Sequence, residues 1–465
     1  MKKLITFLLC FALFFAVAGC DSGSGGTGGT GGGTEKPEPD IPAVVTNETY
    51  QSYWMVQHDY KTMPIAAFNA VPIQTGAYPE SFVTEESYRI LAESGINVAY
   101  SLYDRLDQYP QDVMNALTYC EKYGISYVAG MNNSNGQTNT SILENIIYST
   151  LIKDDPEALG GVLIMDEPSY INMEDMATSR DCFEELLGKK LYYSGNLFPT
   201  YATESQLYNR LQSTPPIPEG GYSYEQYVQD YIEIYDPQAL SYDYYPVQGK
   251  GTALMDGYYE NMSIIRKYAM EAKIPFWVYI QTCSFNANVR IPTEAEINWL
   301  VNSSLAYGCK GIQYFTYWCP LSGGETFTGA MISVDGTKTE IYDYVQKINK
   351  HIAAIDEVLM CSLSQGIMVA GASPCTIPEE DIIESYENLK SVSGASAMVG
   401  CFNYNGLPAY YVFNNTNVSQ EVITLEFDSA CSGYTIQAAE KAEFSGKQSM
   451  DLTLAAGEGV LVVLG

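Results

Sequence analysis

The sequence predicts an α/β protein, namely a (β/α)8 TIM-type barrel followed by a C-terminal all-β sandwich domain. Between residues 64 and 355, short apolar runs alternate with amphipathic segments, which is the pattern of βα units around a parallel sheet. Eight such units fit a barrel that typically takes about 250 residues and often carries insertions. After Ile355 the chain changes to closely spaced strand-like runs separated by turn residues, which favours a sandwich of about 100 residues.

The eight strands and the helices between them can be placed along the chain. The expected strands cover residues 64–72, 97–103, 126–132, 161–167, 190–198, 239–247, 275–282 and 311–318. The expected helices cover residues 85–94, 110–123, 173–187, 224–235, 258–272, 293–307 and 339–355. An open doubly wound sheet is the alternative, but no G-x-G-x-x-G or P-loop follows any strand.

The composition excludes several classes of protein. The 465 residues carry 24 Lys and Arg against 55 Asp and Glu, a formal net charge of −31, which repels nucleic acid. Because 46% of the residues are hydrophobic, the chain can bury a large core and is not disordered throughout. A His-rich zinc site or a Ser-His-Asp triad would depend on His58 or His351, the only two histidines. The 39 Tyr residues favour flat neutral ligands such as sugars.

The N-terminus has the features of a targeting segment. Lys2 and Lys3 precede an apolar run over residues 4–18, as in a secretory signal peptide covering residues 1–19. The sequence Val17-Ala18-Gly19-Cys20 resembles the lipobox of bacterial lipoproteins, which implies lipidation of Cys20 and an extracytoplasmic protein tethered to a bacterial membrane. An ordinary signal peptide with an incidental cysteine is the alternative.

The segment after Cys20 is expected to be a tether, and two domains follow it. Residues 20–46 are first rich in Gly, Ser and Thr and then in Pro and Glu, so a flexible coil leads into a stiffer spacer. We place the barrel at residues 47–357 and the sandwich at residues 358–465. The sandwich either binds carbohydrate or covers one side of the barrel.

The cysteines indicate neither a disulfide framework nor a zinc site. Of the 11 cysteines, Cys10 belongs to the signal peptide and Cys20 to the lipobox. The others lack C-x-x-C spacing and are expected to be buried thiols. No nucleotide, flavin or haem motif is present, so we predict no cofactor and no metal.

In a barrel of this kind, the catalytic groups lie at the carboxyl ends of the strands. The fourth expected strand runs through five apolar or small residues into Asp166 and Glu167, and Pro168 then ends it. Two adjacent carboxylates at the mouth of a buried sheet repel each other, so one of them should keep its proton to higher pH, as a general acid requires. The alternative is that Asp166 caps a helix and Glu167 is merely solvated.

Asp243, at the end of the sixth expected strand, is the second candidate carboxylate. Tyr242, Tyr244 and Tyr245 flank it; a phenol hydroxyl can orient an ionised Asp, and a Tyr ring can line a sugar subsite. We therefore expect Tyr242 and Tyr245 to contact substrate. A loop-start Asx turn is the alternative for Asp243.

Other polar and aromatic residues also end strands. An amide side chain both donates and accepts hydrogen bonds, as recognition of sugar hydroxyls requires. The candidates for substrate binding are Asn69, Asn132, Asn196 and Gln281. Trp318 ends the eighth expected strand and is either a platform under a sugar ring or a residue that packs at the rim of the barrel.

Together these features resemble a barrel-type glycoside hydrolase from a bacterial lipoprotein. The layout is most similar to the large retaining clan, which has an Asn-Glu acid/base motif after strand four and a Glu nucleophile after strand seven. The resemblance gives Glu167 the role of general acid/base. The chain departs from the clan in two ways: Asp166 replaces the Asn, and the seventh strand ends in Gln281-Thr282-Cys283 with no carboxylate.

Two mechanisms would accommodate the missing nucleophile. In the first, Asp243 acts as nucleophile or base opposite Glu167. In the second, which resembles the hexosaminidase families, Asp166 orients a substrate N-acetyl group that itself attacks. Three functions follow: a hydrolase of extracytoplasmic glycans, a non-catalytic glycan-binding lipoprotein on a degenerate barrel, and a structural or adhesive surface protein. The sequence does not predict the oligomeric state.

Overall fold

The structure is a computed structural model that describes residues 61–74, 78–102, 109–130, 156–187, 191–210, 215–321 and 325–465. The predicted signal peptide, Cys20, the tether and Asn132 lie outside these residues, so the structure leaves these predictions open. None of the helices in the described ranges is long and apolar enough to cross a bilayer.

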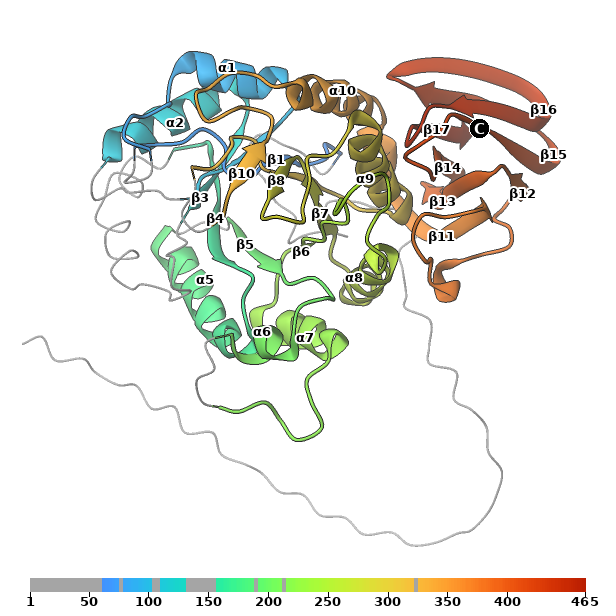
Figure 1. Cartoon of the computed structure of the whole chain (residues 1–465). Coiled ribbons are helices and arrows are strands. Elements are labelled where there is room, and N and C mark those ends of the chain that lie inside the picture. Colours follow the sequence, from blue (N-terminus) through green and yellow to red (C-terminus); the bar gives the residue numbers. More distant parts are fainter. Residues whose placement is uncertain are drawn as a thin grey trace, which may run out of the picture. The chain divides into compact units, whose positions relative to one another are not determined.

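Eight parallel strands form a closed barrel in the order β1-β2-β3-β4-β5-β6-β7-β9 (Figure 1). Each observed strand overlaps one of the eight predicted strands, so the TIM-type barrel is confirmed and the open doubly wound sheet is wrong. The strands are β1 (Ile65–Ala67), β2 (Val98–Tyr100), β3 (Ser126–Gly130), β4 (Leu159–Asp166), β5 (Tyr192–Leu197), β6 (Leu240–Tyr242), β7 (Phe276–Gln281) and β9 (Ile312–Phe315).

Helices surround the barrel strands (Figure 1). Thr84, Ser223 and Thr293 begin three of them, because each side chain accepts a hydrogen bond from a backbone N–H of the first turn. Gly124 ends α2, and Gly308 ends the helix that begins at Thr293, both in the left-handed conformation that glycine adopts easily. The helices are α1 (Glu85–Glu93), α2 (Pro110–Tyr123), α5 (Met173–Leu187), α6 (Glu204–Asn209), α7 (Tyr224–Asp230) with its π-helical extension Tyr231–Tyr235, α8 (Tyr258–Ala272), α9 (Glu294–Tyr307) and α10 (Glu340–Met360).

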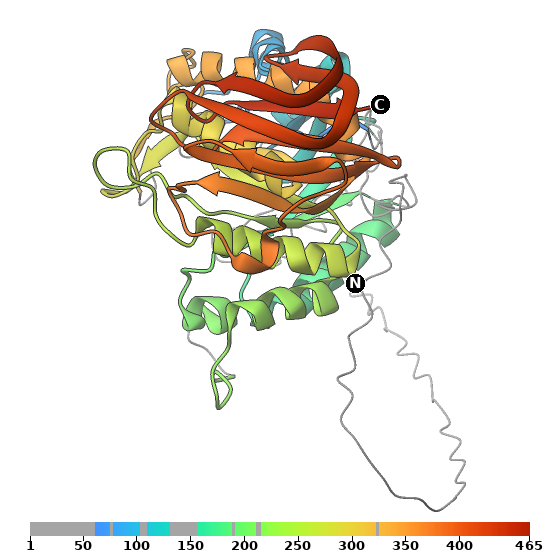
Figure 2. The same cartoon turned by 90° about the vertical axis from the view of Figure 1, so that its right-hand side faces the viewer.

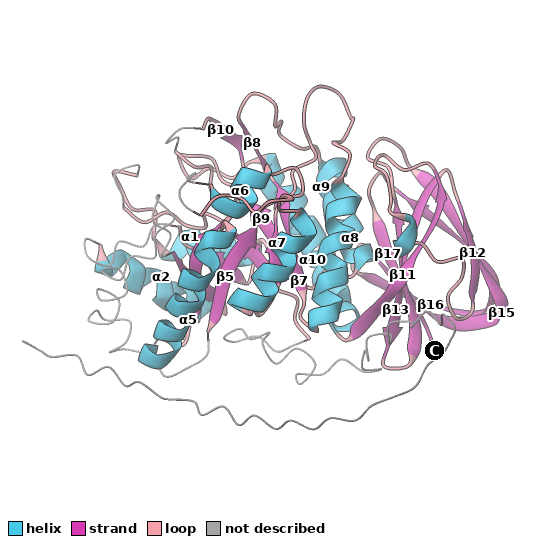
Figure 3. Cartoon of the chain, turned by 90° about the horizontal axis from the view of Figure 1, so that it is seen from below, coloured by secondary structure: helices cyan, strands magenta, loops and turns pink. Residues whose placement is uncertain are grey.

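A short antiparallel ribbon lies at one end of the barrel (Figure 3). It consists of β8 (Cys283–Phe285), which follows β7, and β10 (Phe327–Gly329), which follows β9. Because both strands leave the carboxyl ends of barrel strands, the ribbon belongs to the face where active sites of this fold are built.

The residues after α10 form a β-sandwich, as predicted. The sheet order is β11-β13-β14-β17-β15-β12, and β16 pairs with β15. The first half of β15 pairs with β12 and its second half with β17, so the sheet folds back on itself and encloses a second core (Figure 2). The strands are β11 (Ser362–Gly371), β12 (Leu389–Ser393), β13 (Ser396–Tyr404), β14 (Leu407–Asn414), β15 (Glu421–Gln437), β16 (Glu440–Leu454) and β17 (Gly459–Leu464).

One face of the sandwich packs against barrel helices α9 and α10. Phe402, Tyr411 and Phe413 from this face belong to the same hydrophobic core as the barrel helices. Asn415 Oδ1 accepts hydrogen bonds from Trp299 Nε1 at 2.9 Å and from the Tyr259 hydroxyl at 2.7 Å. The sandwich therefore covers one side of the barrel, which is one of the two predicted roles.

The cysteines that the structure describes are free thiols. Seven of the nine are buried, which confirms the prediction that they pack as small hydrophobic residues. The two half-buried ones are Cys182 and Cys431.

His351 makes the packing of the sandwich on α10 sensitive to acid. It is 6% exposed, its Nε2 lies 3.3 Å from the Tyr411 hydroxyl, and its Nδ1 accepts a hydrogen bond from the Ala439 N–H. Burial lowers the pKa of His351 from 6.5 to about 4, so the folded protein holds this side chain neutral. The neutral side chain is compatible with folding above pH 6.5, and the associated stability is lost as the pH falls towards 4.

We therefore expect a His351→Gln variant to lose less stability than the wild type between pH 7 and pH 4. The difference should be about 3 kcal/mol, because each unit of pKa shift corresponds to about 1.4 kcal/mol. Urea unfolding of both proteins at pH 7 and pH 4 measures it. Equal losses in the two proteins would contradict the assigned role of His351.

Candidate active site

A bulge in β4 turns Asp166 into the barrel. Leu163 pairs with Ser194, but the next pairs are Met165 with Gly195 and Asp166 with Asn196, so β4 has one extra residue. Leu163 packs in the barrel interior, whereas Ile164 and Met165 both pack outward against the helices. The bulge thus shifts the inward–outward alternation by one residue, and Asp166 faces the interior beside Asn196.

Glu167 follows in a strained backbone conformation. Its φ of 49° lies in the left-handed region, which is rare for a residue with a long side chain and is common at functional sites. Its N–H donates to the Asn196 carbonyl at 2.9 Å, which fixes this turn. The side chain is 29% exposed, and its Oε2 lies 3.3 Å from Arg210 Nη1. Glu167 is thus held at the carboxyl end of the barrel, with its side chain partly exposed to solvent.

Asp243 lies one residue beyond β6. Ser241 pairs with Asn196, and strand alternation places Asp243 on the same inward face as Ser241. Asp243 is 8% exposed, and its Oδ1 has no hydrogen-bond partner among the described residues. A buried carboxyl oxygen without a protein partner is costly, which is typical of a group that serves a ligand or a reaction.

The three carboxyl groups influence one another's charge. Burial raises the pKa of Asp166 to about 6, against the hydrogen bond from Asn196 and the charge of Arg210. Burial, and next the charge of Asp166, raises the pKa of Glu167 to about 7. Burial first, and then the charges of Glu167 and Asp166, holds the pKa of Asp243 well above its usual range. Together, the three carboxyl groups therefore retain protons near neutral pH, as acid–base catalysis requires.

Asn196 links two of these carboxyl groups. It hydrogen-bonds to both Asp166 and Asp243. Its Oδ1 accepts a hydrogen bond from Ser241 Oγ at 3.3 Å, and Ser241 Oγ accepts one from Gln313 Nε2 at 2.7 Å. Because its oxygen is occupied, Asn196 presents its NH2 group to the carboxylates.

Tyr245 joins this group, but Tyr242 does not. Tyr245 packs in the barrel interior, near enough to Asp243 and Asp166 that their charges, after burial, raise the pKa of its phenol. Tyr242 points the opposite way along β6 and is fully buried between the strands and the helices. The prediction that Tyr242 contacts substrate is therefore wrong.

Asn69 and Trp318 contact each other rather than the carboxyl groups. Asn69 Nδ2 donates to the Trp318 carbonyl at 2.8 Å, which ties the end of β1 to the chain after β9. Trp318 is 3% exposed and packs against Phe82, with ring centroids 4.7 Å apart. The rim-packing alternative for Trp318 thus describes the structure, and the sugar-platform prediction does not. Asn69 also lines a small pocket between the ends of β1 and β2.

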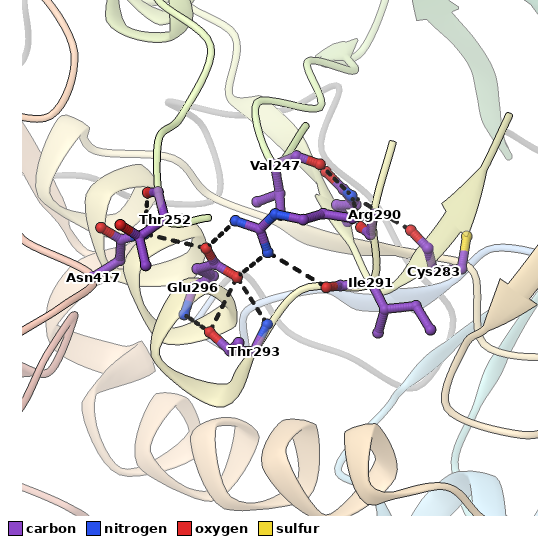
Figure 4. A network of polar contacts seen from close by, with 9 residues as sticks. Val247, Thr252, Cys283, Arg290, Ile291, Thr293, Glu296 and Asn417 are labelled. Atoms are coloured by element: carbon purple, nitrogen blue, oxygen red, sulfur yellow. Dashed lines mark hydrogen bonds and ion pairs between the residues drawn. The ribbon is translucent and has the colours of Figure 1, made fainter. Parts of the chain in front are cut away.

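Gln281 holds the loops of the catalytic face. It is fully buried, and its Nε2 donates to the Val247 carbonyl at 3.1 Å and to the Arg290 carbonyl at 2.6 Å (Figure 4). These carbonyls belong to the loops after β6 and β7. Because its NH2 group is used in this way, the structure gives Gln281 a positioning role. Its Oε1 has no hydrogen-bond partner among the described residues, so the predicted contact with substrate stays a prediction.

The same network extends into the sandwich domain. Arg290 binds Glu296 through both terminal nitrogens, with Nη1 2.7 Å from Oε2, and Glu296 also caps α9 through Thr293 (Figure 4). Asn417 donates to Glu296 Oε1 at 3.2 Å and to the Thr252 carbonyl at 2.9 Å. Two catalytic-face loops, α9 and the sandwich therefore share one buried ion pair.

We expect Glu296→Gln to destabilise the protein by about 3 kcal/mol, because it leaves the half-buried Arg290 guanidinium without the charged partner that it binds through two nitrogens. Glu294 is a matched control on the same first turn. Its ion pair with Lys347, at 2.8 Å, is exposed, so Glu294→Gln should cost less than about 0.5 kcal/mol. Urea unfolding at pH 7 compares the two variants, and similar losses would contradict the prediction.

Sequence reasoning missed three residues beside the carboxyl groups: Tyr201 after β5, Arg210 after α6, and Glu325 before β10. The charge of Glu325 raises the pKa of Glu167, and Asn286 Nδ2 donates to Glu325 Oε1 at 2.9 Å. Tyr201 lies near Asp243 and Glu167. Tyr201 closely follows the end of a predicted strand, so it could have been predicted. Arg210 and Glu325 lie too far from any strand end to be predicted in this way.

Comparisons with known proteins agree with this architecture. Residues 193–355 match the family model Glyco_hydro_42, described as beta-galactosidase. No curated protein sequence matches the chain. Among solved structures, the GH42 beta-galactosidase Gan42B from G. stearothermophilus is similar with a TM-score of 0.56 and 8% identity, covering 89% of this chain and 100% of that one.

A second beta-galactosidase, from Bacillus circulans sp. alkalophilus, is similar with a TM-score of 0.52 and 8% identity, covering 87% of this chain and 99% of that one. At such low identity these structures demonstrate the shared fold alone. The family match extends over less than half of the chain, and it includes Asn196 and Asp243. With the closed barrel, it confirms the predicted resemblance to barrel-type glycoside hydrolases.

Proposed function

We propose that the protein hydrolyses a polysaccharide or oligosaccharide outside the cytoplasm, with Glu167 as general acid/base and Asp243 as the second carboxylate. The observation that carries the proposal is the set of three interacting carboxyl groups at the carboxyl ends of β4 and β6. Glu167, which is partly exposed, has a pKa of about 7, and the buried Asp243 has an oxygen without a hydrogen-bond partner among the described residues.

Glu167 suits the role of proton donor. At a pKa of about 7 it is protonated in a large fraction of molecules at neutral pH and can protonate the oxygen of the leaving sugar. The same group can then remove a proton from water once the neighbouring charges change. Arg210, which is 55% exposed, limits the rise of this pKa without neutralising the site.

Asp243 and Asp166 suit different versions of the reaction. Asp243 faces the barrel interior with a free oxygen, so it can act as nucleophile or as base for water once it has lost its proton. Asp166, fixed by Asn196 beside Glu167, can orient an N-acetyl group of a substrate that attacks its own anomeric carbon. We favour Asp243, because it alone of the two has an unpartnered buried oxygen among the described residues.

The matched family and the solved relatives make a β-galactoside the first substrate to test. We would measure sugar release from aryl β-galactosides, β-glucosides and N-acetyl-β-glucosaminides, and follow the first-formed anomer by NMR. Hydrolysis of substrates without an N-acetyl group supports Asp243 as the second carboxylate. Hydrolysis confined to N-acetylated substrates would overturn that role and favour Asp166.

The non-catalytic alternative gives a distinct result. A glycan-binding protein on a degenerate barrel would be retarded by a polysaccharide in affinity electrophoresis and would release no sugar on long incubation. Release that disappears in Glu167→Gln supports hydrolysis, and retention without release would overturn it. The exposed residue Glu174 on α5 provides the matched control, Glu174→Gln.

We further propose that lipid on Cys20 anchors the enzyme to a bacterial membrane. The support is the sequence Val17-Ala18-Gly19-Cys20 and the Gly-rich segment after it. The full-length protein expressed in a bacterial host should incorporate labelled palmitate and sediment with membranes, whereas Cys20→Ala should do neither. Incorporation of label into the Cys20→Ala variant would exclude this anchor.

A further inference from the structure

Tyr201 differs from the other aromatic residues of the chain. At 51% exposure it is the only strongly exposed aromatic residue among those that the structure describes, although the sequence contains 39 Tyr. The exposure is not that of a loose surface side chain, because Tyr201 lies four residues after β5, at the carboxyl end of the barrel where the carboxyl groups lie. The exposure of an aromatic ring at the catalytic face therefore requires an explanation.

The loop that carries Tyr201 is firmly held. The Thr200 N–H donates to Asn261 Oδ1 at 2.6 Å, and the Ala202 N–H donates to the Pro199 carbonyl at 2.9 Å. Immediately afterwards Thr203 caps α6 in a reciprocal capping box with Gln206. The backbone on both sides of Tyr201 is therefore fixed, and the ring is presented in a defined place before any ligand arrives.

A second ring fixes the orientation of Tyr201. The Tyr244 ring meets it edge-to-face, with centroids 5.1 Å apart and planes at 70°. Tyr244 is itself held, because its hydroxyl donates to the Asp256 carbonyl and its ring packs on Tyr258. Since Tyr244 directly follows Asp243 in the chain, this contact also ties Tyr201 to the catalytic carboxyl groups.

The solvent exposure of three neighbouring residues increases from the barrel interior outwards. Asp243 is 8% exposed, the Glu167 side chain 29%, and Tyr201 51%. Tyr201 is close enough to both carboxyl groups that their charges, after burial, raise the pKa of its phenol. A sugar cleaved between Glu167 and Asp243 would thus have its outer neighbour beside the Tyr201 ring.

We propose that Tyr201 is the stacking platform for the sugar ring on the solvent side of the scissile bond. This inference rests on the proposed function and adds a substrate class to it: an oligosaccharide of at least two rings. The apolar face of a pyranose packs on an aromatic ring, and a rigid ring costs little conformational entropy on binding. The platform contributes to binding of the second ring and not to bond cleavage itself.

The test compares a substrate that reaches the platform with one that does not. We expect Tyr201→Ala to lower kcat/KM for β-1,4-linked galactotriose about tenfold and to change kcat/KM for methyl β-galactopyranoside less than twofold. Tyr201→Phe, which keeps the ring, should resemble the wild type on both. Tyr344→Ala on α10 is the control for loss of a partly exposed Tyr elsewhere. Equal losses on both substrates, or no loss on either, would overturn the platform.

A binding measurement separates the platform from the catalytic proposal. Calorimetry with galactotriose would compare Glu167→Gln with the double variant Glu167→Gln/Tyr201→Ala. A tenfold weaker Kd in the double variant supports the platform even if the wild type releases no sugar, in which case only the proposed hydrolysis fails. Equal Kd values, or no binding of galactotriose by Glu167→Gln, would overturn the platform.

Discussion

Glu167→Gln is expected to lower kcat/KM for an oligosaccharide by about 10²- to 10⁴-fold, the range that a positioned general acid contributes. Gln has almost the same shape but carries no acidic proton, so the leaving sugar must depart as an unstable alkoxide. A dinitrophenyl glycoside, whose leaving group needs no proton, should lose much less activity in the cleavage step. Steady-state and pre-steady-state rates on the two substrates measure this contrast, and equal losses on both would contradict the role of acid.

The pH dependence gives an independent check on Glu167. A general acid must hold its proton, and its pKa of about 7 predicts that kcat/KM of the wild type falls about tenfold per unit above pH 7. The observed value belongs to the set of three carboxyl groups rather than to one residue. The fall should be absent in Glu167→Gln and unchanged in Glu174→Gln. A wild-type profile that is flat between pH 6 and pH 9 would remove the acid role from Glu167.

The fold could be predicted from the sequence because it depends on a repeated pattern. Each barrel strand is a short apolar run between an amphipathic helix and a polar loop, and eight repeats leave few other architectures. In the sandwich, strand β16 shows no such pattern. β16 is almost wholly exposed, so its residues show no apolar alternation, and only its pairing with β15 makes it a strand. Local patterns do not contain information about such pairing.

The site could be predicted only in part. A polar residue at the end of a predicted strand is expected at the catalytic face. This rule identified Asp166, Glu167, Asp243 and Asn196. It does not indicate which way the side chain points. A one-residue bulge sends Asp166 inward, and strand alternation sends Tyr242 outward, although Tyr242 and Asp243 are adjacent in sequence. Gln281 ends a strand as well, but its NH2 group donates hydrogen bonds to carbonyls of two loops, a positioning role that the strand end does not reveal.

Asp243→Asn is expected to abolish most activity and yet to stabilise the protein at neutral pH. Asn cannot act as nucleophile or base, so kcat/KM should fall at least about 10²-fold. The substitution keeps the shape of the side chain and removes a carboxyl group that is 8% exposed beside two others. Most buried substitutions lose activity and stability together, so an inactive, stabilised variant has a specific cause.

The cause is electrostatic, and its sign can be checked by pH. Burial, Glu167 and Asp166 raise the pKa of Asp243 above its unfolded value of 3.8, so the folded protein binds this proton more tightly than the unfolded chain. The stability of the wild type therefore falls, relative to that of Asp243→Asn, as the pH rises above about 4. The melting temperature of the variant should match that of the wild type near pH 4 and exceed it by a few degrees at pH 8.

Asp256→Asn gives the opposite sign and serves as the control. Hydrogen bonds from the backbone N–H groups of Thr376 and Gly257 lower the pKa of Asp256, so its charge is favoured in the folded state. Its replacement should therefore lower the melting temperature at pH 8 and change it less at pH 3, because the stability that this charge provides is lost as the pH falls below 3.8 towards the folded-state pKa. If Asp243→Asn behaved like Asp256→Asn, Asp243 would be a structural carboxylate. The second catalytic carboxylate would then have to be Asp166.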